Sequence, residues 1–289
     1  MWFLFALTFA LTSSIGVILA KKVMQNVNEK MFLLISSFFS IPLLFLLILV
    51  FYQIPKIDLV FILSLLVSSG IGVVAALLAY KAIKESEISL VNPISAFNPV
   101  FTSIISFFTL KEVIGPKGAV GILLIVIGAY LLQASKLKEG VLAPIKALVG
   151  HKGIQMSFLA YFLWSITPIF EKTAIFHTSP SVPPFASLVG GIMVVPVYLF
   201  LIRKEVKSMF RQIRVNFKAL LLIGILGAVG QASAFMAFSL TNLGFATAIF
   251  KLSMVFTVIF GWLFFKEKDI KNRLLGSLVM LLGAALLVV

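Results

Sequence analysis

Long stretches without a charged residue constrain this chain more than any other feature. Asp, Glu, Lys and Arg are absent from ten stretches, most of them 16 to 25 residues long. A helix needs about 20 apolar residues to cross the hydrocarbon core of a bilayer. Hydrophobic residues make up 61% of the chain and charged residues 12%, whereas about 25% of a typical soluble domain is charged. We therefore predict an all-α polytopic membrane protein and exclude both a soluble enzyme and a nucleic-acid-binding protein.

Turn signals divide these stretches into helices. Residues 219–250 are too long for one crossing, and Thr241-Asn242-Leu243-Gly244 is typical of a turn. Lys251 alone separates the second piece from 252–265, so we expect one helix there. The sequence thus predicts ten transmembrane helices, at 2–20, 31–52, 59–82, 88–110, 116–134, 153–172, 183–202, 217–239, 243–265 and 272–289.

The basic residues predict an orientation. The odd-numbered loops between the predicted helices hold 19 Lys and Arg residues, and the even-numbered loops hold four. Basic residues favour the cytoplasmic side, so we expect odd-numbered loops inside and both termini outside a plasma (inner) membrane. The net charge of +14 is then mainly an orientation signal and not the mark of a nucleic-acid partner. The cluster around Arg211 in loop 7 is a candidate contact for anionic lipid headgroups.

The two halves of the chain resemble each other at an offset of 155 residues. Val100-Phe101-Thr102 matches Val255-Phe256-Thr257, and Lys111-Glu112 matches Lys266-Glu267. Gly121 and Gly128 match Gly276 and Gly283 in the same way. We predict a first repeat at 1–135, a cytoplasmic linker at 136–152 and a second repeat at 153–289. Five helices in each repeat invert the second copy in the membrane, as in many secondary transporters.

An ordered set of short motifs carries a family resemblance. It comprises Ala79-Tyr80-Lys81-Ala82, Asn92-Pro93, Asn98-Pro99, Leu110-Lys111-Glu112 and the glycines 118, 121 and 128, partly duplicated in the second half. Over nearly the whole chain this set resembles the EamA-type carriers of the drug/metabolite transporter superfamily. The resemblance implies a ten-helix carrier of small metabolites, often an exporter of amino acids or related compounds. It also implies that helices 1, 3, 4, 6, 8 and 9 surround the cavity.

Lys251 is the sharpest single feature. It lies between a third and half of the way into the ninth predicted helix, where a cation costs several kcal/mol unless it snorkels, pairs or faces water. One interpretation is a side chain that snorkels toward the outer surface. The other is a positive point in a central cavity that attracts a substrate carboxylate or phosphate.

Helix 4 is expected to kink. Each proline of Asn92-Pro93 and Asn98-Pro99 lacks an N–H group and frees a carbonyl one turn back, and such groups need partners or a water-lined cavity in a membrane. Asn92 and Asn98 are therefore substrate-binding candidates, and Pro93 and Pro99 are hinge candidates together with Pro168 in helix 6. Kinking without cavity lining is the alternative. At the matching positions of the second repeat, Ala248 and Met254 replace the two prolines. Helix 9 thus lacks the prolines and carries the charge of Lys251.

Further polar and aromatic residues lie within the predicted helices. Aromatic rings at Tyr80 and Trp164 are candidates to stack on a substrate, with membrane-interface anchoring as the alternative. Interhelical hydrogen bonding is the alternative for Gln231. The remaining substrate-binding candidates are Ser14, Ser165 and Thr167.

The acidic residues lie outside the middle of the spans. Glu171 and Lys172 are expected to pair at the membrane boundary, with gating as the alternative. Glu112 and Glu267 end their helices and are expected to cap or pair there. The paired glycines at an i, i+7 spacing predict close packing of helices 5 and 10.

The combined interpretation is a secondary transporter. We expect it to export a small metabolite, an amino acid or related organic anion or zwitterion, by alternating access. The alternative is a broad exporter of hydrophobic or drug-like compounds. Cysteine is absent and only two histidines occur, so no metal site and no cofactor are expected. The sequence also contains no plausible nucleophile–base pair, so we do not expect an enzyme. The expected partners are a small-molecule substrate and membrane lipid; a monomer suffices, and a dimer is compatible.

Overall fold

The computed structural model describes residues 1–85, 95–131, 152–265 and 270–288. Apart from one pair of two-residue strands, all its regular elements are helices. In chain order they are α1 Trp2–Val23, α2 Glu29–Phe51, β1 Lys56–Ile57, α3 Leu59–Glu85, α5 Asn98–Leu110, α6 Pro116–Leu131, α8 Lys152–Phe176, β2 Thr178–Ser179, α9 Pro183–Ile202, α10 Val206–Leu240, α11 Leu243–Phe250, α12 Ser253–Phe265 and α13 Ile270–Val288.

Six of the described helices are long and apolar enough to cross a membrane, namely α1, α2, α3, α8, α9 and α10. Shorter apolar helical stretches cover Asn98–Leu110, Pro116–Leu131, Leu243–Thr257 and Leu275–Leu287. The expected all-helical polytopic membrane architecture is therefore confirmed. Of the predicted linker, residues 136–151 lie outside the described part of the chain.

The helix boundaries differ from the sequence prediction at three main places. The predicted helix at 88–110 is interrupted by a turn at Ala96 and Phe97, so α5 begins only at Asn98. The predicted continuous helix at 243–265 is wrong, because the chain breaks between α11 and α12 at Lys251 and Leu252. α10 begins at Val206, eleven residues earlier than predicted, and bends at Asn216, whose φ and ψ are not helical. The added turns carry Lys207, Arg211 and Arg214 of loop 7, and charge alone did not reveal that these residues are helical.

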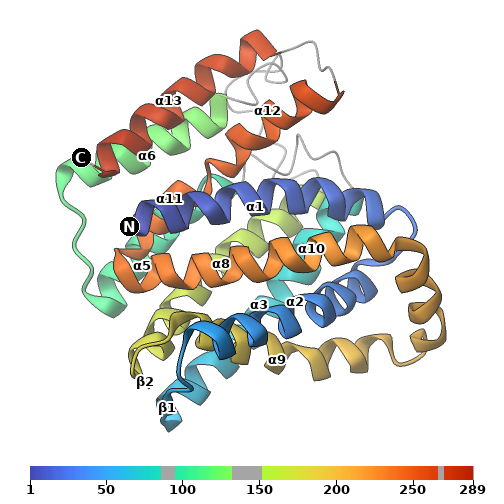
Figure 1. Cartoon of the computed structure of the whole chain (residues 1–289). Helices are drawn as coiled ribbons and strands as arrows, with labels where there is room; N and C mark the ends of the chain where they lie inside the picture. Colours follow the sequence, from blue (N-terminus) through green and yellow to red (C-terminus); the bar gives the residue numbers. More distant parts are fainter. Residues whose placement is uncertain (86–94, 132–151, 266–269, 289) are drawn as a thin grey trace.

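Figure 1 shows how the helices are arranged. α6 and α13 lie side by side at one edge of the bundle, and α9 lies toward the opposite edge. Between them, α1 packs on α10 and α3 packs on α8, while α5 contacts both α8 and α11. Both termini and the β1–β2 pair lie at one end of the bundle, which we call the terminal end.

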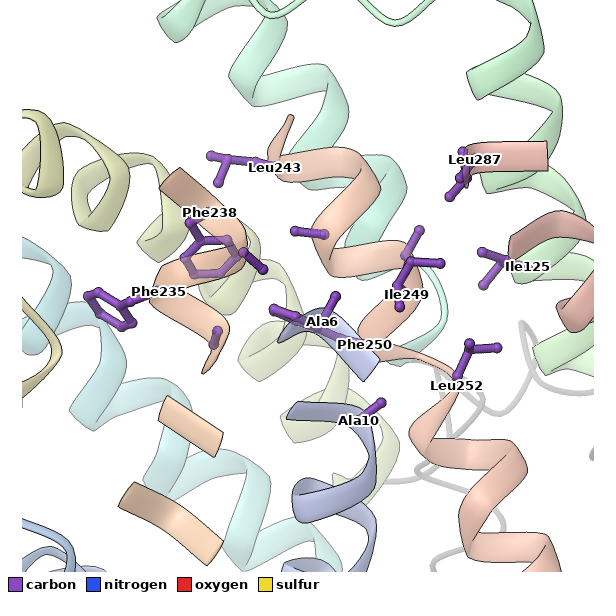
Figure 2. Packing of buried hydrophobic residues seen from close by; sticks show 14 of the residues in the cluster. Ala6, Ala10, Ile125, Phe235, Phe238, Leu243, Ile249, Phe250, Leu252 and Leu287 are labelled. Atoms are coloured by element: carbon purple, nitrogen blue, oxygen red, sulfur yellow. The ribbon is translucent and has the colours of Figure 1, made fainter. Parts of the chain in front are cut away.

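The core lies where α1, α10 and α11 meet (Figure 2). Ala6 and Ala10 of α1 are completely buried there, and Phe250 of α11 packs between Phe9 and Phe238, with ring centroids 4.2 and 5.6 Å away. Alanines on α1 bring its backbone close to α11, because small side chains permit close helix approach in lipid. This packing fixes where α11 ends, and so where the chain breaks.

Glycines join α6 to α13, as the spacing predicts. A Cβ atom added at Gly128 would lie 2.6 Å from the backbone nitrogen of Met280 and 2.7 Å from the carbonyl oxygen of Gly276. A Cβ atom at Gly121 would lie 3.0 Å from the carbonyl oxygen of Gly283. Gly121 thus faces Gly283 and Gly128 faces Gly276, which makes the two helices antiparallel.

We predict that Gly128→Ala lowers the thermal stability of the protein in detergent. The added methyl group meets backbone on α13, so the helices must separate, and overpacking of this kind costs about 1–3 kcal/mol. Gly70→Ala is the matched control, because nothing lies within 4 Å of a Cβ atom there and alanine has the higher helix propensity. A Gly128→Ala protein that melts at or above the temperature of Gly70→Ala would contradict this packing.

Candidate functional site

The candidate site forms around two helix breaks at equivalent positions of the repeat. α12 begins at Ser253, and α5 begins 155 residues earlier at Asn98. The turn residues before them are Lys251-Leu252 and Ala96-Phe97. At the second break the Lys251 and Leu252 N–H groups bond the carbonyls three residues back, at 3.0 and 2.9 Å. These tighter bonds satisfy the backbone while the helix axis changes direction.

The Lys251 side chain points into the bundle from this break. Its Nζ lies 5.3 Å from the ring centroid of Tyr161 on α8, within the range of a cation–π interaction. Tyr161 lies 15 residues before the terminal end of α8 at Phe176, which is about 22 Å at 1.5 Å per residue. Among the described residues, no carboxylate forms an ion pair with Lys251.

Asn98 approaches the same point of α8 from the first break. Its Nδ2 donates to the carbonyl oxygen of Tyr161 at 3.1 Å. Pro99 follows in the first turn of α5, where its missing N–H group leaves no helical bond unmade. The predicted departure from a straight helix is therefore present, and it takes the form of a helix start at Asn98. Asn92 and Pro93 lie outside the described residues.

Aromatic rings line the neighbouring turn of α8. Trp164 lies 5.6 Å from Tyr161, centroid to centroid. Tyr80 on α3 contacts Phe32 at 5.3 Å, centroid to centroid. Tyr80 and Trp164 both pack against one hydrophobic cluster, to which α1, α2, α3, α9 and α10 contribute. Ser95 hydrogen-bonds the Tyr161 hydroxyl group. Tyr161 is thus the common partner of Lys251, Asn98, Ser95 and Trp164.

Sequence reasoning missed Tyr161. A signal was available, because Tyr161 precedes Trp164 by three residues and so shares its helix face. Tyrosine is frequent at membrane interfaces, however, and nothing local in the sequence shows that Lys251 and Asn98 converge on this residue.

The other predicted site residues lie apart from Tyr161 or bond within their own helices. Ser14 donates to the Leu11 carbonyl at 2.7 Å, and Ser165 donates to the Phe162 carbonyl at 2.5 Å. Both hydroxyl groups are buried. Pro168 lies inside α8, which continues to Phe176. Gln231 is exposed on α10.

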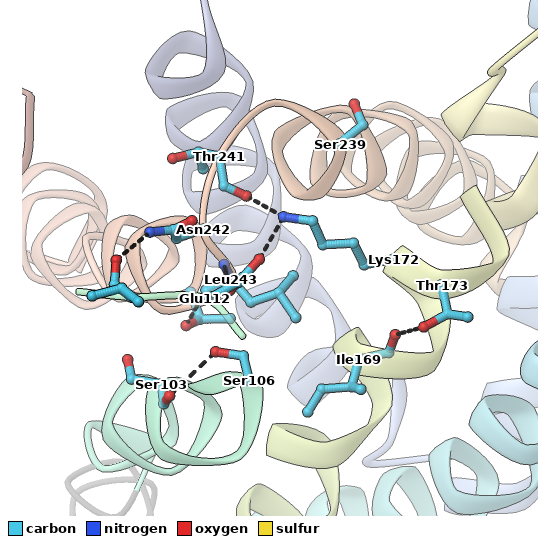
Figure 3. Close-up of polar contacts among 12 residues, drawn as sticks. Ser103, Ser106, Glu112, Ile169, Lys172, Thr173, Ser239, Thr241, Asn242 and Leu243 are labelled. Carbon is cyan, nitrogen blue, oxygen red and sulfur yellow. Dashed lines mark hydrogen bonds and ion pairs between the residues drawn. The ribbon is translucent and has the colours of Figure 1, made fainter. Parts of the chain in front are cut away.

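A buried ion pair closes the terminal end of the bundle (Figure 3). Lys172 Nζ lies 2.6 Å from Glu112 Oε1 and donates to the Thr241 carbonyl, also at 2.6 Å. Glu112 Oε2 accepts from the Leu243 N–H group at 2.8 Å, which caps the start of α11. One pair therefore joins the ends of α5, α8, α10 and α11. The expectation that Glu112 caps or pairs at a helix boundary is confirmed.

The predicted pairing of Glu171 with Lys172 is wrong. Glu171 Oε1 instead accepts from the Ser68 hydroxyl at 2.8 Å. Adjacent residues on an α-helix point about 100° apart, so these two side chains meet different neighbours. Thr167, a substrate-binding candidate by sequence, lies beside Glu171. In the described residues no cluster of three or more His, Asp and Glu side chains is placed to hold a metal ion.

We predict strong coupling between Lys172 and Glu112. Lys172→Met leaves the Glu112 carboxylate buried without its cation, and breaking a buried pair in this way costs about 3–5 kcal/mol. The double variant Lys172→Met/Glu112→Gln should lose much less than the sum of the two single variants, as measured by thermal melting in detergent. Lys117→Met, at an exposed position, is the control. Additive losses would show that the pair is not an energetic unit.

Comparison with known proteins shows that this fold also occurs in a solved structure. A solved protein crystal structure superposes with a TM-score of 0.75 over 99% of this chain and 95% of that chain, at 12% identity. An uncharacterized protein of Methanocaldococcus jannaschii is 36% identical over 70 residues, which are 24% of this chain and 51% of the relative. The chain thus matches about half the length of that curated relative.

The sequence profile of one family covers almost all of the chain. It matches residues 1–133 and again residues 151–289, which are nearly the two predicted repeats and leave only the linker unmatched. Members of this family are membrane transporters, in agreement with the interpretation as a carrier and not an enzyme. The chain belongs to the EamA-like transporter family.

Proposed function

We propose that this protein is a secondary transporter that moves a small metabolite by alternating access of two inverted five-helix repeats. The substrate class that fits best is an amino acid or related organic anion or zwitterion, and the proposed direction is export across the plasma membrane. The single observation that carries the substrate class is the Lys251 ammonium group over Tyr161, deep between α8 and the α11–α12 break.

The helix contacts support the inverted repeat. Exchanging the repeats converts the α3–α8 contact into α10–α1, and the α3–α9 contact into α10–α2. It also converts the α5–α8 contact into that of α11 and α12 with α1. The Gly121–Gly283 contact becomes Gly276–Gly128. Each contact and its counterpart occur, so the two halves have equivalent packing partners. Such equivalence is what two inverted repeats, related by a pseudo-two-fold axis, need in order to exchange conformations.

The break geometry supports binding near the middle of the bundle. Discontinuous helices at equivalent positions of two repeats are typical of substrate sites in secondary transporters. Here one break supplies Asn98 and the other supplies Lys251, and both contact Tyr161. A carboxylate that replaces the tyrosine ring as the partner of Lys251 gains a full charge interaction in place of a cation–π contact.

The closed terminal end supports alternating access. Lys172 and Glu112 seal the ends of four helices on that side. If, as we propose, the odd-numbered loops face the cytoplasm, this side is the outer one, and we assign the structure to a state closed to the outside. Export then requires the ion pair to separate once in each cycle.

We expect carboxylate- or phosphate-bearing metabolites to stabilise the parent protein and not Lys251→Met. A ligand at about 100 times its dissociation constant stabilises by about 2.7 kcal/mol. The measurement is thermal melting in detergent against a panel of amino acids, organic acids, phosphate esters and apolar cations. Uptake of the stabilising compound into proteoliposomes then tests vectorial movement.

Lys218→Met is the matched control, because Lys218 is exposed near the opposite end of α10. It should respond to the panel as the parent does. Equal stabilisation of the parent and Lys251→Met by carboxylates would refute the anion site at Lys251. Stabilisation of both by apolar or cationic compounds would favour the alternative of a broad exporter of hydrophobic compounds, to which Tyr161, Trp164 and Tyr80 offer aromatic surface.

A further inference from the structure

Two carboxyl groups near the terminal end differ in their hydrogen-bond partners. Glu112 accepts from Lys172 Nζ and from the Leu243 N–H group, and both of these are donors only. Glu171 accepts from the Ser68 hydroxyl at 2.8 Å, and the Thr167 hydroxyl lies beside the same carboxyl group. Hydroxyl groups both donate and accept, so Glu171 keeps its partners whether or not it carries a proton.

Glu171 also lies at a contact between the two repeats. Ser68 belongs to α3 of the first repeat, whereas Glu171 and Thr167 belong to α8 of the second. Ser68 and Thr167 are buried. Glu171 is half-buried at this contact, and an ionised carboxylate held there without a cation opposes tight packing, because partial removal of the charge from water is costly. The proton on Glu171 therefore acts on a surface that must shift when the repeats change their relative position.

The charged and titratable groups around Glu171 are already engaged or distant. Lys172 pairs with Glu112. Asp58 pairs with His177 at 2.7 Å, and the Phe61 N–H group and His177 hold the pKa of Asp58 below its usual range. The described parts of α5 and α9 carry no Asp, Glu, Lys or Arg, and α9 has Tyr198. The remaining groups of α8 are Tyr161 and, at its start, Lys152. Those of α3 and α10 lie toward the opposite ends of these helices, at Tyr80, Lys81, Lys84 and Glu85 of α3 and at Lys207, Arg211, Arg214 and Lys218 of α10.

We propose that Glu171, with Ser68 and Thr167, is a proton-binding site whose occupancy controls opening of the terminal end. A neutral Glu171 stabilises the packed α3–α8 contact and the closed end. An ionised Glu171 favours separation of the repeats and entry of water. The inference rests on the proposed function in that it gives the carrier its coupling ion, a proton.

The absence of cysteine provides a test that needs no substrate. Ser106 is completely buried on α5, next to the turn that carries Glu112, and Ser106→Cys is nearly isosteric. A maleimide reaches this thiol only when the terminal end opens. Ser181→Cys, at an exposed position, measures the intrinsic rise of thiolate reactivity toward a pKa of about 8.5. The ratio of the two labelling rates, measured in nanodiscs from about pH 5 to about pH 8, reports opening.

In the Ser106→Cys protein the normalised rate should rise with pH, by at most about tenfold per pH unit, which is the limit for one linked proton. Adding Glu171→Gln should give a low rate that does not change with pH. Glu171→Asp retains a titratable group and should retain a pH-dependent rate. Ser68→Ala should move the midpoint, whereas the matched Ser69→Ala, whose hydroxyl bonds the Gly190 carbonyl on α9, should not.

A normalised rate that is flat with pH in the Ser106→Cys protein would overturn the proposal. An unchanged pH profile in Glu171→Gln would also overturn it. In that case, His177→Gln tests whether the Asp58–His177 pair is the source of the pH dependence. Thermal melting of each variant separates loss of folding from loss of titration. Because metabolite binding is measured separately on Lys251, failure of the proton site leaves the proposed substrate class intact, and the converse also holds.

Discussion

Backbone hydrogen bonding is the constraint on which the rest of this structure depends. Inside a bilayer, unpaired N–H and C=O groups cost several kcal/mol each, so helices break only where other partners are available. At Lys251 and Leu252 those partners are carbonyls three residues back. At Asn98 the side-chain amide bonds the Tyr161 carbonyl of α8 while Pro99 occupies the first turn. Both breaks are thereby confined to one level of the bundle, and that level holds the candidate site.

Charge spacing made most of the fold predictable. Helix positions followed from stretches without charged residues, because a cation or anion in hydrocarbon is expensive enough to mark most helix ends. Glycines seven residues apart marked α6 and α13 as closely packed scaffold helices, since small residues allow backbones to approach, but the sequence did not show that these two helices pack on each other. Each of these predictions depends on the spacing of one residue type, charged residues or glycines, and that spacing can be counted in a single sequence.

The site was less predictable because it depends on pairs. Lys251 and Asn98 stand out in the sequence as unusual residues, and both contact Tyr161 in the structure, but Tyr161 is ordinary in isolation. The break at Lys251 was missed because no glycine or proline stands there; the first-repeat counterpart uses Pro99 for the same bend. Lys172 was predicted to pair with its sequence neighbour Glu171, whereas it forms its ion pair with Glu112, 60 positions away. Sequence distance carries no information about such contacts.

The two breaks share a backbone position and differ in chemistry. Ala96 stands where the second repeat has Lys251, so the symmetric scaffold carries one positive charge and not two. A second lysine at Ala96 would face the first across the same tyrosine, and two like charges in a low dielectric repel strongly. Equal packing partners allow the repeats to exchange conformations, whereas a single charge gives a bound anion one orientation. Duplication thus accounts for the helix scaffold, and divergence at a single position of the repeat accounts for the proposed specificity.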